Sequence, residues 1–190
     1  MTTAKEKTPA RLDAEASKNW CDSEQKFTTF NTTENALLKA LIWCPARLIL
    51  DVASGLEEQD FFNEHARIIY REILRVAHDL DVQGYDDYEI HAGVIRNALK
   101  ATGCLNDPLD AFLLSITATG DPAPIPPTVH RLAQDLRVER LRRALDTAGR
   151  ELIVASQDSH DHILVAIGRT QHLQALARRA GVERQAGEHV

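Results

Sequence analysis

The chain has 190 residues, 44% of them hydrophobic and 26% charged, which suits one ordinary folded domain with an appendage and excludes disorder throughout. The formal net charge of -6 opposes the positive field that a protein coating nucleic acid needs. No run approaches the roughly 18 apolar residues of a membrane span, and the start carries charges where a signal peptide is apolar. We therefore expect a cytoplasmic protein that has no membrane contact.

Apolar residues change from scattered to periodic near residue 32. Few of them occur in residues 1–31, which predicts a flexible tail. Beyond this point they recur at spacings of three and four, the pattern of amphipathic helices, and no alternation of period two indicates a strand. Thr33 and Asp107 stand where N-caps are expected, and Gly103 where a helix should stop. The expected helices span about residues 33–44, 45–54, 63–78, 87–102 and 107–119. Together they predict a compact multi-helix head over residues 32–120.

Four of the seven prolines fall in residues 121–127, DPAPIPP, which predicts a linker that cannot be helical throughout. Thr128 should cap a long helix that runs to about Ser156, and a second helix is expected from about His160 to Ala180. Two helices joined by a short polar turn predict a long antiparallel hairpin over residues 128–180, followed by a disordered tail over 181–190. The predicted fold class is all-α, with a compact head followed by this hairpin.

The hairpin carries more apolar residues than it can bury by itself. One group repeats at coiled-coil spacing along the first helix, a second group lies upstream of it, and further residues lie on the second helix. Packing of these residues against the head is one interpretation. We favour a contact between subunits, and hence a homo-oligomer, because an unsatisfied apolar surface is typical of a partner surface. The candidate partner-binding residues are Leu132, Leu136, Val138, Leu141, Leu145, Leu152, Ile163 and Ile167.

The motifs of common enzymes are missing. No lysine follows a glycine, so the loop that cradles nucleotide phosphates is absent, and no two glycines are separated by one residue as a dinucleotide site requires. His160 and His162 are more typical of a solvated helix start than of a metal site. Glu57, Glu58 and Asp60 are interpreted as helix-end charge. We expect no catalytic residue, no cofactor and no metal.

Three cysteines are too few and too far apart for a disulfide framework, and they are interpreted as reduced thiols. They are Cys21, Cys44 and Cys104.

Basic residues concentrate in residues 131–150. Acidic residues are interleaved with them, which favours the salt-bridged outer face of a long helix over a phosphate-binding stripe. The arginines are Arg131, Arg137, Arg140, Arg142, Arg143 and Arg150, and the acidic residues are Asp135, Glu139, Asp146 and Glu151.

Three segments resemble the N-terminal domain of DnaB-type replicative helicases. They read TENALLKALIWCPARLILDVASGLEEQDFFNEHARIIYREILRV, KATGCLND and RLAQDLRVERLRRALDTAGREL, in this order. The matching features are Glu34 before an apolar helix that breaks at a proline, and an arginine-rich stretch over Val138 to Ile153. A further pattern is formed by Leu56, Asp60, Phe61, His65, Ile69 and Tyr70. The resemblance covers about residues 32–178.

This resemblance implies a helical head and a hairpin that pairs with the hairpin of a neighbouring subunit. In the family these parts build a ring collar above the motor, and the collar receives the C-terminal domain of primase. The family continues into a RecA-like ATPase, whereas this chain ends at Val190, so we expect a complete protein without a motor. Asn106-Asp107-Pro108 replaces the family's usual Gly-Gly before the short helix.

The expected function is that of a DNA-replication interaction module without ATPase activity. It would self-associate through its hairpin, contact a replicative helicase, a primase or both, and meet DNA only indirectly. One alternative is a mobile-element adaptor or inhibitor that inserts into the collar of a host helicase. Another is a helical nucleic-acid-binding protein that uses the arginine face of residues 131–150, whose binding would weaken steeply with salt.

Overall fold

The computed structural model describes residues 33–118, 125–157 and 160–182, and within these ranges the fold is all-helical, as predicted. A single antiparallel bridge, Pro45 to Glu89, is the β-type pairing that the described residues show. None of their helices combines the length and the apolar character of a membrane span. The elements are a helix over residues 33–42, α2 (Ala46–Ala53), the 3-10 helix η1 (Glu58–Asp60), α3 (Glu64–Val82), α4 (Ala92–Ala101), α5 (Asp107–Thr117), α6 (Pro126–Ala155), α7 (His160–Arg169) and α8 (Gln171–Arg179).

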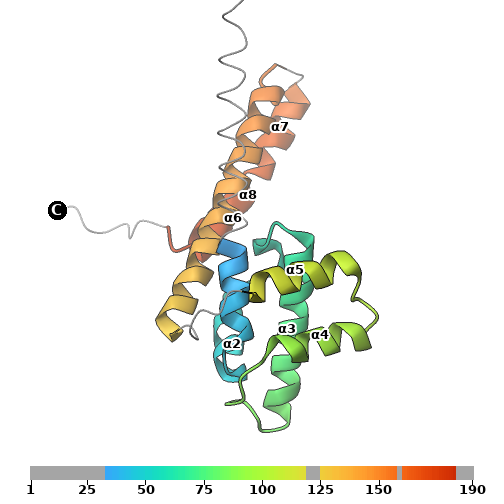
Figure 1. Ribbon diagram of the computed structural model, residues 1–190. Helices are drawn as coiled ribbons and strands as arrows, with labels where there is room; N and C mark the ends of the chain where they lie inside the picture. The colour runs from blue at the N-terminus through green and yellow to red at the C-terminus, as the bar shows by residue number, and fades with distance from the viewer. Residues whose placement is uncertain (1–32, 119–124, 158–159, 183–190) are drawn as a thin grey trace, which may run out of the picture.

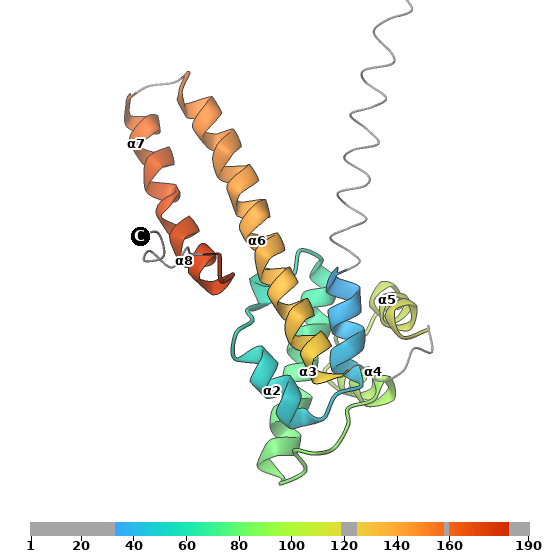
Figure 2. The ribbon, with the colours of Figure 1, turned by 90° about the vertical axis from the view of Figure 1, so that its left-hand side faces the viewer.

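The helices of residues 33–118 gather in one group, which we call the N-terminal cluster (Figure 1). The later part of α6 extends beyond this cluster, and α7 and α8 return alongside it in the opposite direction (Figure 2). We call residues 141–182 the arm. The predicted tail over 1–31, residues 121–124 of the predicted linker and residues 183–190 of the predicted C-terminal tail lie outside the described ranges.

The N-terminal cluster is built around α3, which packs against α2, α4 and α5. Asn63 caps α3, since its side chain accepts hydrogen bonds from the backbone N–H of His65 at 2.8 Å and of Ala66 at 3.4 Å. Tyr70 is 1% exposed, and its ring centroid lies 4.7 Å from that of the fully buried Phe61. An aromatic pair of this kind at the start of α3 fixes where the preceding loop lies.

The first half of α6 belongs to the core of the N-terminal cluster. Val129, Ala133 and Leu136 are at most 4% exposed and pack in the same apolar core as the cluster helices, with Leu132 half-buried against it. For the fully buried Leu136 the prediction of a partner contact is therefore corrected, whereas for the half-buried Leu132 it stays a prediction. Both contact the chain's own core, which was the competing interpretation.

α6 also starts earlier than predicted. It begins at Pro126 after Ile125, so Thr128 lies inside the helix and two prolines of the predicted linker form its first turn. Proline is tolerated there because the first N–H groups of a helix have no intrahelical partner. The second hairpin helix, predicted as one element, is interrupted at Thr170 between α7 and α8.

Tertiary contacts move other boundaries in the N-terminal cluster. α4 begins at Ala92 rather than near Asp87, because the N–H of Ile90 donates to the carbonyl of Cys44 at 3.2 Å and holds the preceding chain extended. Asn106, one residue before the predicted Asp107, caps α5 through a 2.9 Å hydrogen bond from the N–H of Leu109.

Two other predicted helix ends have different outcomes. Thr33 lies within its helix rather than before it, so it does not cap that helix as predicted. Gly103 follows α4 with φ 71° and ends it as predicted, since an L-residue is strained in that conformation.

We expect Leu136→Ala to lower the free energy of unfolding by about 2–5 kcal/mol, because it opens a cavity in a core shared by α6 and the cluster helices. Leu114→Ala is the matched control. Leu114 is 54% exposed on α5, so its loss should cost less than about 1 kcal/mol. Urea denaturation followed by circular dichroism measures both. Equal losses in the two variants would show that α6 does not share this core.

Candidate interaction surface on α6 and α7

In the arm, α6 buries one line of residues against α7 and α8. Leu141, Ala148 and Ala155 are 6%, 5% and 6% exposed, and they follow one another at intervals of seven residues. A seven-residue spacing keeps side chains on one side of a helix. Ala166 of α7 is 7% exposed, and α6 contacts both α7 and α8. We call this buried line the seam.

A second apolar line lies beside the seam and is not covered. Leu145 and Leu152 are also seven residues apart, and they are 50% and 38% exposed. Ile153 on the same helix is 65% exposed, and three large apolar residues of α7 are each more than half exposed. Exposed apolar side chains on neighbouring helices are typical of a protein contact surface. We call this set the exposed arm residues: Leu145, Leu152, Ile153, Leu164, Val165 and Ile167.

The candidate residues from the sequence fall into different environments. Leu132 and Leu136 lie at the core of the N-terminal cluster, and Leu141 lies in the seam. Val138 and Ile163 are half-buried. The structure leaves three of the candidates exposed on the arm, namely Leu145, Leu152 and Ile167.

Three exposed arm residues were missed, although the sequence carries a signal for them. Leu152 to Ala155 and Ile163 to Ile167 are runs of consecutive apolar residues. A helix that packs on one side cannot bury every residue of such a run. Runs of this kind therefore predict exposed apolar side chains, and here they account for Ile153, Leu164 and Val165.

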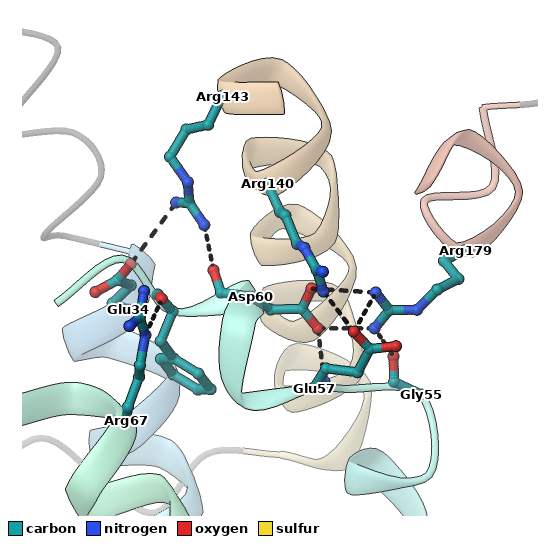
Figure 3. Close-up of polar contacts among 9 residues, drawn as sticks. Glu34, Gly55, Glu57, Asp60, Arg67, Arg140, Arg143 and Arg179 are labelled. Carbon is teal, nitrogen blue, oxygen red and sulfur yellow. Dashed lines mark hydrogen bonds and ion pairs between the residues drawn. The ribbon is translucent and has the colours of Figure 1, made fainter. Parts of the chain in front are cut away.

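Asp60 connects the N-terminal cluster to α6 and α8 (Figure 3). Its side chain is fully buried, and its carboxylate accepts hydrogen bonds from the backbone N–H of Glu57 at 2.7 Å, Nη1 of Arg140 at 3.0 Å and Nη2 of Arg179 at 2.9 Å. Arg140 also donates to Oε2 of Glu57 at 2.6 Å. A buried carboxylate is costly unless donors surround it. These contacts supply the donors.

A second buried carboxylate lies nearby. Glu34 is 1% exposed and accepts hydrogen bonds from the backbone N–H groups of Phe62 and Asn63. Nη1 of Arg143 lies 3.8 Å from Oε1 of Glu34, and Arg143 donates to the backbone carbonyl of Asp60. Burial lowers the pKa of the Arg143 guanidinium, and the charge of Glu34 opposes that shift. The loop before α3 is thus held by Glu34 of the first helix and by Arg143 of α6.

Glu139 of α6 is a further buried acid, at 7% exposed. Burial raises the pKa of its carboxyl group above the ordinary value. A 2.6 Å hydrogen bond from Oγ1 of Thr33 and the charge of Arg143 offset part of this rise. Thr33 therefore anchors the first helix on α6.

The arginines of residues 131–150 do not share one environment. Arg150 pairs with Asp146 at 2.8 Å on the exposed surface, as expected for a salt-bridged outer face. Arg140 and Arg143 turn onto the N-terminal cluster instead. The interpretation of Glu57 and Asp60 as helix-end charge holds in part. They form a reciprocal capping box around η1, and they also bind arginines of the long helix and α8.

A hollow of about 440 Å³ lies between the arm and the loop before α3. Phe62, Arg143, Ala148 and His172 are among its lining residues, and the guanidinium carbon of Arg143 lies 5.6 Å from the ring centroid of Phe62. No group of three potential metal ligands occurs among the described residues. The side chains of His160 and His162 lie outside the described set.

Two of the cysteines are described, and both are free thiols. Burial raises the pKa of Cys44 to about 11, with a further contribution from Glu89. Cys104 is exposed, and Cys21 lies outside the described residues.

No family model, curated protein or solved structure matches this chain. The resemblance to helicase N-terminal domains therefore depends on the sequence segments alone and stays a prediction. The structure adds the positions of the residues, above all the buried Asp60 and the exposed arm residues.

We expect Asp60→Asn to lower the free energy of unfolding by about 3–5 kcal/mol, because it leaves two partly buried arginines without their shared carboxylate. Glu58→Gln is the control. It removes the charge of a more exposed acid, paired with Arg71 at 2.6 Å, and should cost at most about 1 kcal/mol. Chemical denaturation distinguishes the variants. A loss no larger for Asp60→Asn than for Glu58→Gln would contradict a central role for Asp60.

Proposed function

We propose that this chain is a protein-interaction module of DNA replication that self-associates through the exposed arm residues and contacts a replicative helicase, a primase or both. In this proposal the N-terminal cluster is the head, and α6 with α7 and α8 is the hairpin. The observation that carries the proposal is the exposure of Leu145 and Leu152 beside the buried seam. Helices with this spacing usually bury both lines, so the second line fits a further helix.

The charges beside Leu145 favour a second copy as that helix. Arg142, Asp146 and Arg150 follow one another at intervals of four residues and alternate in sign. A surface that carries both signs is compatible with itself in a two-fold arrangement, whereas a partner of one sign would meet repulsion.

The replication partners are inferred from the resemblance to the helicase domain. The residues that carry this resemblance have structural roles here: Glu34, Asp60 and Phe61 are all buried and hold the loop before α3. This supports a related head fold. A contact of this head with primase, or of the hairpin with a helicase collar, remains part of the proposal.

We expect the purified protein neither to hydrolyse ATP nor to unwind duplex DNA, because the sequence has no phosphate-cradling loop. Phosphate release and strand-separation assays measure this. Turnover that follows the protein through successive columns and disappears on a point mutation of this chain would contradict the proposal.

Self-association is tested with the double variant Leu145→Asp/Leu152→Asp. Two charges in an apolar contact should cost several kcal/mol and convert the oligomer to a monomer that stays folded, with a melting temperature that no longer depends on protein concentration. Leu141 is left unchanged because it is buried within the chain's own seam. The measurement is sedimentation velocity over a range of concentrations, combined with thermal melting.

Val82→Asp/Leu114→Asp is the matched control, because these apolar residues are 86% and 54% exposed on the N-terminal cluster. It should keep the parent's oligomeric state. A parent that is monomeric at all concentrations, or a folded arm variant that still assembles, would contradict self-association. A monomeric parent that co-sediments with an intact replicative helicase would favour the adaptor or inhibitor alternative.

A further inference from the structure

The helix α8 packs on α6 without burying any of its own side chains. α7 and α8 are separate helices with Thr170 between them. No side chain of α8 is buried, and Leu173, Leu176 and Ala177 are half-buried. A helix of nine residues has little stability of its own, so contacts with neighbours decide whether α8 stays in place.

Arg179, the last residue of α8, ties it to the N-terminal cluster. Its guanidinium donates to Oδ2 of Asp60 at 2.9 Å and to the carbonyl of Gly55 at 3.3 Å, and it lies 3.3 Å from Oε2 of Glu57. Figure 3 shows this side chain reaching Asp60 from the side opposite Arg143. The next residue, Ala180, is 1% exposed, and its carbonyl accepts a hydrogen bond from Gln134 of α6. Polar contacts therefore hold this end of α8.

Departure of Arg179 would leave Asp60 with other donors. The carboxylate would keep its contacts with Nη1 of Arg140 at 3.0 Å and with the backbone N–H of Glu57 at 2.7 Å. Arg140 belongs to α6, which is fixed to the cluster by core residues such as Leu136. Release of α8 thus avoids the large penalty of an unpaired buried charge. Loss of Arg179 removes a contact between α8 and the cluster, whereas loss of Arg140 removes a contact between α6 and the cluster.

We propose that α8 is a latch that is closed by Arg179 and can open while Asp60 stays paired with Arg140. Because α8 runs antiparallel beside α6 and contacts it, its opening uncovers the part of α6 that it covers and enlarges the exposed surface of the arm (Figure 2). This device concerns the chain itself and does not require self-association.

Hydrogen exchange measured by mass spectrometry tests the latch on the full chain. We expect Arg179→Met to speed exchange of the amides of residues 171–182 on the order of ten- to a hundredfold, the effect of losing a charged hydrogen bond, while the amides of α3 keep the parent's rates. Gln174→Met is the control, since Gln174 is exposed on the same helix, and it should leave exchange in α8 within about twofold of the parent.

Arg140→Met completes the set. It removes the hydrogen bonds that join α6 to both Asp60 and Glu57, so it loosens α6 from the loop before α3, and exchange should rise in α3 as well as in α8. Unchanged exchange of α8 in Arg179→Met, or an equal rise in Gln174→Met, would overturn the latch. So would a rise in α3 in Arg179→Met, because the cluster and α8 would then open together. Repetition in the Leu145→Asp/Leu152→Asp background separates opening of α8 from any loss of subunit contacts.

Discussion

A buried carboxylate has to find its partners inside the protein, and in this chain Asp60 finds them on elements that are distant in sequence. Arg140 is 80 residues away and Arg179 is 119 residues away, yet both bind the same side chain. Their convergence requires η1, α6 and the end of α8 to occupy fixed relative positions. One fully buried acid is thus the point at which these three elements meet.

α6 meets two environments along its 30 residues. Its first half contributes Val129, Ala133 and Leu136 to the core of the N-terminal cluster, and its second half contributes Leu141, Ala148 and Ala155 to the seam. Arg140 and Arg143 lie where one environment gives way to the other, and both reach back to the loop before α3. The ionic contacts therefore act at the point where α6 leaves the cluster.

The repeating pattern of apolar residues made the helices predictable, since spacings of three and four report one buried side. It could not show which neighbour that side would meet. Leu136 and Leu145 belong to similar patterns, yet one is fully buried in the cluster and the other is half exposed. Leu136 is buried because that part of α6 packs on the cluster, whereas Leu145 lies beyond it. This packing joins segments that are distant in sequence, so local spacing does not report it.

The ionic contacts were hidden for the same reason. Glu57, Asp60 and the arginines of α6 are each ordinary helix residues in the sequence, and local spacing suggested local partners. Such a pattern did indicate a salt-bridged outer face, and the pair Arg150 to Asp146, four residues apart, is an example of it. The start of α4 is a further example, because a hydrogen bond from Ile90 to the carbonyl of Cys44 delays the helix. Local patterns report helices, whereas the partners of charges and the ends of helices depend on the tertiary fold.

The position of Asp60 also affects what the arm can do. Leu145 and Leu152 lie beyond the ionic contacts, on a helix whose base is fixed by core packing and by Arg140. A surface held in place before it meets a partner loses less conformational entropy on binding than a mobile one does. Leu145 and Leu152 are therefore presented in a defined position, and association through them would not require the arm to be ordered first. α8 differs in this respect, since it buries none of its own side chains and Arg179 joins its end to Asp60, so any change in the shape of the arm should begin there.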